Sequence, residues 1–280
     1  MNRLHISLAT FGLAVLAVCT TVSASDLPRH DPVPGGVAHI PLADTGFAPE
    51  QEIHFNGRTA MVREIDGEWI AVIGIPLSLG EGRHFVELRD GDDNRQRIHF
   101  DVRDKQYEEQ RLQVERRMVH PSAEDLERIG RESRRIRTAL DVWTDEVKTD
   151  TMAFPYPVEG PRSSPFGLRR YFNDEPRRPH SGLDIAVPTG TPITAPAAGR
   201  VVDTGHYYFN GKTVFINHGQ GLVTMYCHMD QIDVEPGDWV DAGTQLGTVG
   251  TTGRVTGAHL HWSVSLNGTM VDPDLFLAEP

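Results

Sequence analysis

Cysteine is scarce in this 280-residue sequence, which contains only Cys19 and Cys227. Cys19 lies in an N-terminal segment that we expect to be removed, so Cys227 would be the only cysteine of the mature chain. This excludes an intramolecular disulfide, and stability must then come from the burial of apolar side chains. Cys227 alternates with His228 along a predicted strand, so we interpret it as a small core residue and not as a nucleophile.

An excess of basic residues is also lacking. The chain has 27 Lys and Arg against 39 Asp and Glu, which gives a formal net charge of −12. Binding to nucleic-acid phosphates depends on clustered Lys and Arg side chains, so we expect no nucleic-acid partner.

The N-terminal apolar run is too short for a comfortable membrane span, which needs about 20 residues. This run, Ile6–Val18, follows the basic Arg3 and precedes the small residues Val22–Ala24. The pattern is typical of a signal peptide, so we predict that residues 1–24 are removed on export to the periplasm or the medium. No stable membrane span is expected after cleavage. The alternatives are a retained anchor and lipidation at Cys19, where the preceding valine departs from the usual lipoprotein pattern.

Residues 25–104 show short β-type runs separated by turn signals, which predicts a small β-sandwich as an accessory domain. The clearest signals are Asn56-Gly57 and Asp66-Gly67, because both dipeptides tolerate the positive φ angles of tight hairpin turns. Such a domain could target the substrate, act as a lid, or serve as a spacer.

Residues 105–148 change to high charge and helical periodicity, which predicts a helical connector packed against one domain. Ser122 and Asp125 have the spacing of a capping box at a helix start. A short coiled-coil seam between two chains is the alternative. The apolar residues that recur at helical spacing are Leu126, Ile129, Ile136, Leu140, Trp143 and Val147.

The remaining region, residues 149–280, returns to short β-type runs with Gly, Pro and Asp turns and no long helix. We therefore predict a mainly β protein whose C-terminal domain is an antiparallel β structure.

Histidines in this last region have spacings that would let their side chains converge. His180 and Asp184 are four residues apart, so on an extended segment they point to the same side. His259 and His261 are two apart and share one face of a predicted strand, with Trp262 pointing toward a core. Imidazole and carboxylate are suitable zinc ligands.

His228 adds a fifth candidate, on the predicted face of Thr224 and Tyr226 within a strand over residues 223–229. A catalytic zinc site needs three protein ligands, an open position for water and a nearby base. No zincin helix motif with its glutamate base is present, so histidine must fill that role. The spacing alone leaves open which of the five residues bind zinc and which handle protons.

Four segments together resemble the lysostaphin/LytM-type zinc endopeptidases, in the order in which that family carries its motifs. The N-terminal β region and the helical connector also resemble the accessory segments of Gram-negative exported members. The four segments are Ser164–Arg169, His180–Ala186, Tyr226–Met229 and Gly257–Trp262.

The resemblance implies that His180, Asp184 and His261 bind one zinc ion. It also implies that His228 and His259 are the catalytic pair, which handles the proton of a zinc-activated water or steadies the developing oxyanion. The implied substrate is a peptide bond of peptidoglycan, either the D-alanyl cross-link or an oligoglycine bridge. Two alternatives are an autoinhibited or non-catalytic activator of other wall hydrolases and a secreted protease that acts on proteins.

Other polar residues of this region have more ordinary interpretations. We expect His206 and His218 to be surface or hydrogen-bonded structural groups, with His218 in a turn. Groups that could polarise the substrate carbonyl are Tyr171, Asn173, Tyr207 and Tyr208.

Overall fold

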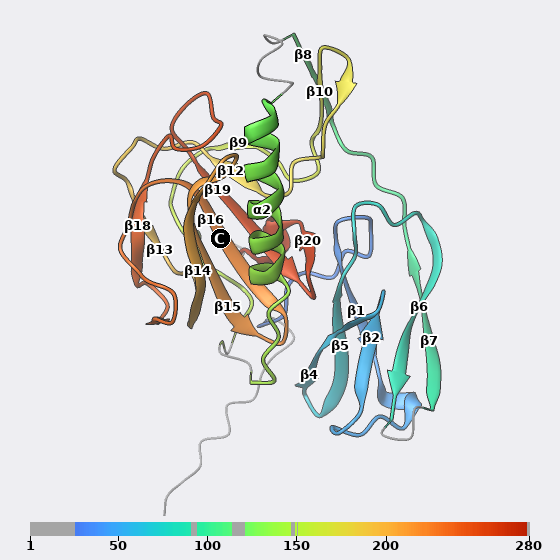
Figure 1. The fold of residues 1–280 in the computed structure, drawn as a ribbon. Helices are drawn as coiled ribbons and strands as arrows, with labels where there is room; N and C mark the ends of the chain where they lie inside the picture. The colour runs from blue at the N-terminus through green and yellow to red at the C-terminus, as the bar shows by residue number, and fades with distance from the viewer. Residues whose placement is uncertain (1–25, 91–93, 114–120, 147–148, 150, 279–280) are drawn as a thin grey trace, which may run out of the picture.

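The computed structural model describes residues 26–90, 94–113, 121–146, 149 and 151–278. The predicted signal peptide, Cys19 and Val147 lie outside these residues. The fold is mainly β, as predicted, with two β regions and α2 (Ala123–Leu140) as the α-helix of the described chain (Figure 1). No helix in the described ranges has the length and apolar character needed to cross a membrane.

The N-terminal region is the predicted β-sandwich, formed by a three-stranded and a four-stranded sheet. Both predicted hairpin turns are confirmed: φ is positive at Asn56 and Gly57, and again at Asp66 and Gly67. The first sheet has the order β1 (Val37–Pro41), β5 (Glu68–Gly74), β4 (Met61–Ile65), and the second β3 (Arg58–Thr59), β2 (Glu52–Phe55), β6 (Gly82–Arg89), β7 (Arg95–Val102).

The three-stranded sheet is buried on both faces. Ala71 and Ile73 of β5 face the second sheet of the sandwich, whereas Val72 points the other way into the core of the C-terminal region. Gly74 permits close contact there, because a Cβ atom at this position would lie 2.8 Å from the carbonyl oxygen of Leu266. The sandwich therefore has its own core and also shares a second one with the C-terminal region.

Helix α2 (Ala123–Leu140) begins as predicted. The backbone N–H of Asp125 donates to the side chain of Ser122, and the capping box is complete. The predicted apolar face is wrong at both ends: Leu126 is 56% exposed, and the helix ends before Trp143. Ile136, Ala139 and Leu140 pack on the sheet, so only the C-terminal half of α2 contributes to the core.

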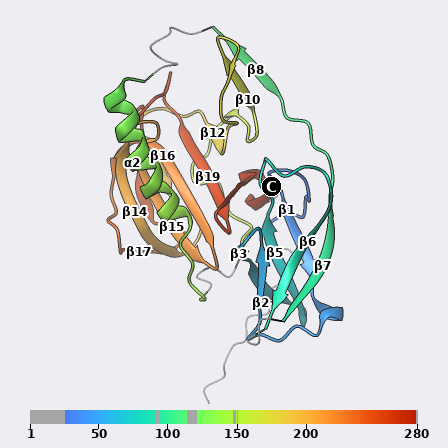
Figure 2. The ribbon, with the colours of Figure 1, turned by 45° about the vertical axis from the view of Figure 1, so that its right-hand side comes forward.

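The connector also contains a strand that was not predicted. Strand β8 (Glu109–Leu112) pairs in parallel with β10 (Arg169–Phe172), which in turn pairs with β11 (Glu175–Pro176). Figure 2 shows β8 running beside β10, away from the sandwich. All four β8 residues are exposed, so no apolar alternation marked this strand in the sequence.

The C-terminal region is a large, predominantly antiparallel sheet, as predicted. Helix α2 covers one face over β14, β15 and β16, and the main core covers the other (Figures 1 and 2). The main path runs β17 (Trp239–Val240), β14 (Gly199–Tyr207), β15 (Gly211–Gly219), β16 (Leu222–Ile232), β19 (Leu260–Leu266), β12 (Leu183–Ile185), β9 (Arg162–Ser164), with β13 (Pro192–Thr194), β18 (Gln245–Val249) and β20 (Thr269–Val271) attached to it.

His218 is a structural histidine of this sheet. It is fully buried in β15, where Nδ1–H donates to the Ala198 carbonyl (2.8 Å) and Nε2 lies 2.8 Å from Thr224 Oγ1. The expectation of a hydrogen-bonded structural group is confirmed, but the expectation of a turn is wrong. Burial lowers the pKa of His218 to about 4.

This lowered pKa predicts acid sensitivity of the fold. Between about pH 6.5 and pH 4 the unfolded chain binds a proton at His218 that the folded chain does not, so stability falls as the pH decreases. His218→Gln should have a lower free energy of unfolding than wild type at pH 7.5. Between pH 7.5 and pH 4.5, however, its free energy of unfolding should fall by about 2 to 3 kcal/mol less than that of wild type. Urea unfolding at both pH values measures this difference. Identical losses in the two proteins would show that His218 does not contribute.

Candidate metal centre

Three side chains converge where β12 meets β19. Asp184 in β12 and His261 in β19 are directly opposite each other in the antiparallel register, so they share one face of the sheet. His180 reaches them from the segment that leads into β12. Gly182 allows this close approach, because a Cβ atom there would lie 2.5 Å from the Trp262 carbonyl oxygen and from Ser263 Oγ.

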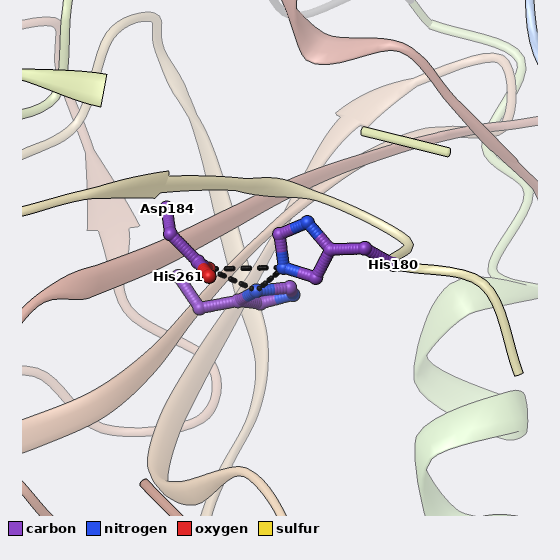
Figure 3. Close-up of side chains that lie close together, drawn as sticks. All are labelled: His180, Asp184 and His261. Atoms are coloured by element: carbon purple, nitrogen blue, oxygen red, sulfur yellow. Dashed lines mark hydrogen bonds and ion pairs between the residues drawn. The ribbon is translucent and has the colours of Figure 1, made fainter. Parts of the chain in front are cut away.

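The donor atoms of these residues form a tight triangle (Figure 3). Nε2 of His180 lies 3.0 Å from Asp184 Oδ1 and 3.0 Å from His261 Nδ1. The third side, from His261 Nδ1 to Asp184 Oδ1, measures 2.8 Å. All three residues are buried. These are the three residues that the resemblance to the zinc endopeptidases implied as ligands.

Hydrogen bonds behind the triangle fix which atoms face inward. His180 Nδ1–H donates to the Pro165 carbonyl (2.8 Å), which leaves Nε2 with a lone pair. Ser263 Oγ lies 2.9 Å from His261 Nε2 and can accept from it, which leaves Nδ1 free. Partners of this kind normally orient histidines that bind metal ions.

The donor set fits a zinc ion. Two imidazole lone pairs and a carboxylate oxygen repel one another at this distance unless a proton or a cation lies among them. Burial by itself would raise the pKa of Asp184, but a proton on the inward nitrogen of His180 or His261, hydrogen-bonded to the carboxylate, outweighs burial and holds that pKa well below its ordinary value. The carboxylate is therefore ionised at neutral pH. Two imidazoles and one carboxylate form a known type of three-ligand catalytic zinc site.

Arg170 supports the carboxylate and was not predicted. Its Nη2 lies 3.8 Å from Asp184 Oδ2 and donates to Ser164 Oγ at 2.6 Å. Ser164 pairs with Asp184 across β9 and β12. The contact of Ser263 with His261 was not predicted either. Ser263 follows His261 by two residues on the same strand face, and this spacing could have indicated the contact.

His228 lies beside the triangle for a reason that the sequence did not reveal. Going from Lys212 to Val214 advances two residues along β15, whereas the paired positions Met229 and Tyr226 are three apart on β16. The extra residue is a β-bulge, and φ of His228 is +62°. Positive φ in a non-glycine residue costs of order 1–3 kcal/mol and is common at functional sites.

The predicted shared face of His228 with Thr224 and Tyr226 is wrong. Tyr226 and Met229 both lie in the main core, so the alternation of faces is broken between them. At the break, β16 also changes its partner from β19 to β18. This opening leaves room for the imidazole to turn toward His261, with ring centroids 5.9 Å apart.

His228 and His259 form a second pair, with ring centroids 4.9 Å apart. In each ring Nδ1–H donates to a backbone carbonyl at 2.9 Å, that of Thr252 for His228 and that of Gly257 for His259. Both Nε2 atoms are left with lone pairs, and Nε2 of His259 lies 3.8 Å from Asp184 Oδ1. Burial lowers the pKa of His228 to about 3, so this ring is neutral at pH 7.

Other candidates have structural roles. Tyr207 is buried beneath α2 with its hydroxyl bound to Asp203, so the expectation that it could polarise a substrate carbonyl is wrong. Tyr171 stacks against Arg111, 4.1 Å from its guanidinium, on the β8 side of the β10 hairpin. Cys227 is fully buried and burial raises the pKa of its thiol to about 12, which confirms a core role.

The remaining candidates are His206, Tyr208 and Asn173. His206 is exposed on β14, as expected for a surface histidine. Tyr208 lies beside Phe209, with ring centroids 4.9 Å apart, and its backbone N–H donates to Glu132 of α2. Asn173 occupies the positive-φ turn between β10 and β11.

Two family models match the chain, one for each of its two β regions. The model described as Peptidase family M23 matches residues 178–273, which contain all five histidine and aspartate candidates. The model described as Peptidase family M23 N-terminal domain matches residues 30–105, the region of the sandwich.

A crystal structure from Pseudomonas aeruginosa, described as a peptidase M23, resembles nearly the whole chain. It has 42% sequence identity and a TM-score of 0.75, and the match covers 89% of this chain and 96% of that one. The likeness therefore includes the sandwich, the connector and the C-terminal sheet.

Similar curated proteins include two bacterial endopeptidases. The DD-carboxypeptidase/endopeptidase Mpg of Neisseria meningitidis is 40% identical over 111 residues, which are 40% of this chain and 26% of Mpg. The peptidoglycan DD-endopeptidase ShyA of Vibrio cholerae is 40% identical over 120 residues, 42% of this chain and 28% of ShyA. The chain thus spans between a quarter and a third of the length of these relatives.

Proposed function

Because this chain belongs to peptidase family M23, we propose that it is an exported zinc metallo-endopeptidase that hydrolyses peptide bonds in peptidoglycan. The observation that supports this most is the buried triangle of His180, Asp184 and His261, whose donor atoms lie within 3.0 Å of one another. We assign these three residues as the ligands of one zinc ion.

The ligand assignment agrees with the chemistry that hydrolysis requires. A zinc ion held by three protein ligands supplies a Lewis acid for the peptide carbonyl and lowers the pKa of a water molecule. Asp184 remains ionised, and His180 and His261 turn unprotonated nitrogens inward. Arg170 lies beside the second oxygen of the Asp184 carboxylate and is itself held by its hydrogen bond to Ser164, which favours one fixed orientation of the carboxylate.

His228 and His259 are assigned to the movement of protons. Backbone carbonyls hold Nδ1–H of each ring, so each Nε2 presents its lone pair toward the space beside the triangle. One Nε2 can accept the proton of the attacking water, and the protonated ring can then donate to the oxyanion or to the leaving amine. A non-catalytic activator would not need this complete set of five residues.

The substrate proposal draws on the name of the similar curated protein ShyA, which is a peptidoglycan DD-endopeptidase. Export is proposed from the N-terminal sequence pattern. It agrees with the proposed substrate, because peptidoglycan lies outside the cytoplasmic membrane.

Digestion of purified, cross-linked peptidoglycan with mass analysis of the products tests this function. Wild-type protein should convert cross-linked dimers to monomers by hydrolysis of the D-alanyl cross-link, and Asp184→Ala should not. Unchanged cross-links together with cleavage of a denatured protein substrate would instead support a secreted protease. Unchanged cross-links with stimulation of an added wall hydrolase would support an activator.

A further inference from the structure

One loop of the C-terminal region holds His180 through three hydrogen bonds. Nδ1–H of His180 donates to the Pro165 carbonyl (2.8 Å), and the backbone N–H of His180 donates to the Leu168 carbonyl (3.0 Å). In the opposite direction, the N–H of Gly167 donates to the His180 carbonyl (2.8 Å). The position of the imidazole therefore depends on the conformation of residues 165–168.

Tyr107 of the connector packs directly on this loop. Its ring covers Gly167 so closely that a Cβ atom there would lie 2.1 Å from Tyr107 Cδ1 and 2.2 Å from Cε1. Gly167 has φ +79°, which also favours glycine. The neighbouring Phe166 meets the same ring edge to face, with centroids 6.2 Å apart.

Tyr107 is itself fixed by the sandwich side of the molecule. Its hydroxyl donates to the Pro34 carbonyl at 2.6 Å. The ammonium group of Lys105 lies 5.5 Å from the ring centroid and 3.2 Å from Asp31 Oδ2. Immediately after Tyr107 the chain joins the β10 hairpin, where the Arg169 N–H donates to the Glu108 carbonyl at 2.9 Å. The ring is thus clamped between residues near the N-terminus of the sandwich and the loop that holds His180.

We propose that Tyr107 is a positioning residue of the metal centre, through which the N-terminal region fixes the loop that orients His180. This inference rests on the proposed zinc site. It assigns the N-terminal region a scaffolding role, distinct from that of a lid or a spacer. Loss of the ring would free the 165–168 loop and misplace one of three ligands, whereas loss of the hydroxyl alone would leave the ring on Gly167.

Zinc affinity of the full-length chain, measured by competition with a chromophoric chelator, tests the proposal without a peptidase assay. Tyr107→Ala should bind zinc about 10- to 100-fold more weakly than wild type, the usual cost of removing a residue that supports a metal ligand. Tyr107→Phe should remain within about threefold of wild type, because the ring is the part that covers Gly167. If the alanine variant does not fold, Tyr107→Leu should show the same loss of affinity.

Tyr156→Ala is the matched control. Tyr156 is a partly buried tyrosine of the C-terminal region with an arginine near its ring, 5.7 Å from the centroid, and it packs against the main core. This variant should lower the melting temperature without weakening zinc binding. Equal zinc affinity of wild type and Tyr107→Ala, or equal losses in Tyr107→Ala and Tyr156→Ala, would overturn the positioning role. A wild-type chain that binds no zinc would overturn both this inference and the proposed function.

Discussion

Replacement of His180, Asp184 or His261 by alanine should remove zinc and lower turnover by on the order of 10⁴-fold or more, as for a member of a catalytic unit. Each residue provides one corner of a triangle whose sides measure 2.8 to 3.0 Å. Two remaining ligands do not make a stable catalytic zinc site. Asp184→Ala should lower the zinc affinity most, because it also removes the negative charge that the cation compensates.

Turnover on cross-linked peptidoglycan and elemental analysis of zinc measure this prediction. His206→Ala is a suitable control, because this histidine is exposed on β14 outside the triangle. It should retain both metal and activity. A ligand variant that keeps a full zinc ion and more than a tenth of wild-type turnover would remove that residue from the proposed ligand set.

Replacement of His228 or His259 by alanine should leave zinc content nearly unchanged and lower turnover by roughly 10²–10⁴-fold, the scale for losing a general acid or base. Neither residue is one of the three whose donor atoms form the triangle. Each ring is oriented by its own backbone carbonyl, so removal of one should not displace the other.

Thermal unfolding of the two variants with zinc bound distinguishes a loss of proton transfer from a folding defect. His228 has φ +62°, so His228→Asn is a useful companion, because asparagine tolerates this conformation but cannot act as the base. It should fold like wild type and be as inactive as His228→Ala. Activity close to that of wild type in His228→Asn would contradict proton transfer by this residue.

Local sequence signals predicted much of the fold. Asn56-Gly57 and Asp66-Gly67 specify hairpin turns through their tolerance of positive φ, and Ser122 with Asp125 specifies the start of α2. These features depend on a few neighbouring residues, so they are visible in one sequence. The convergence of His180 with His261 was predicted from spacing and family resemblance, and the antiparallel pairing of β12 with β19 provides it.

Features that depend on distant segments could not be predicted. The bulge at His228 arises where β16 changes its partner from β19 to β18. The residues around His228 do not indicate either pairing. Strand β8 is exposed and charged, so its pairing with β10 left no apolar pattern. The second face of the three-stranded sheet, where Val72 packs into a core shared between the two β regions, also depends on distant residues.

The measurement that tests the ligand assignment most directly is the zinc content of two variants, in which His259 or His261 is replaced by alanine. His259 and His261 lie two residues apart, and Nε2 of His259 is only 3.8 Å from Asp184 Oδ1, so a small shift of the strand could exchange their roles. Purified without chelator, His259→Ala should carry about one zinc ion per chain and His261→Ala should carry almost none. Loss of the metal from His259→Ala together with its retention in His261→Ala would contradict the assignment.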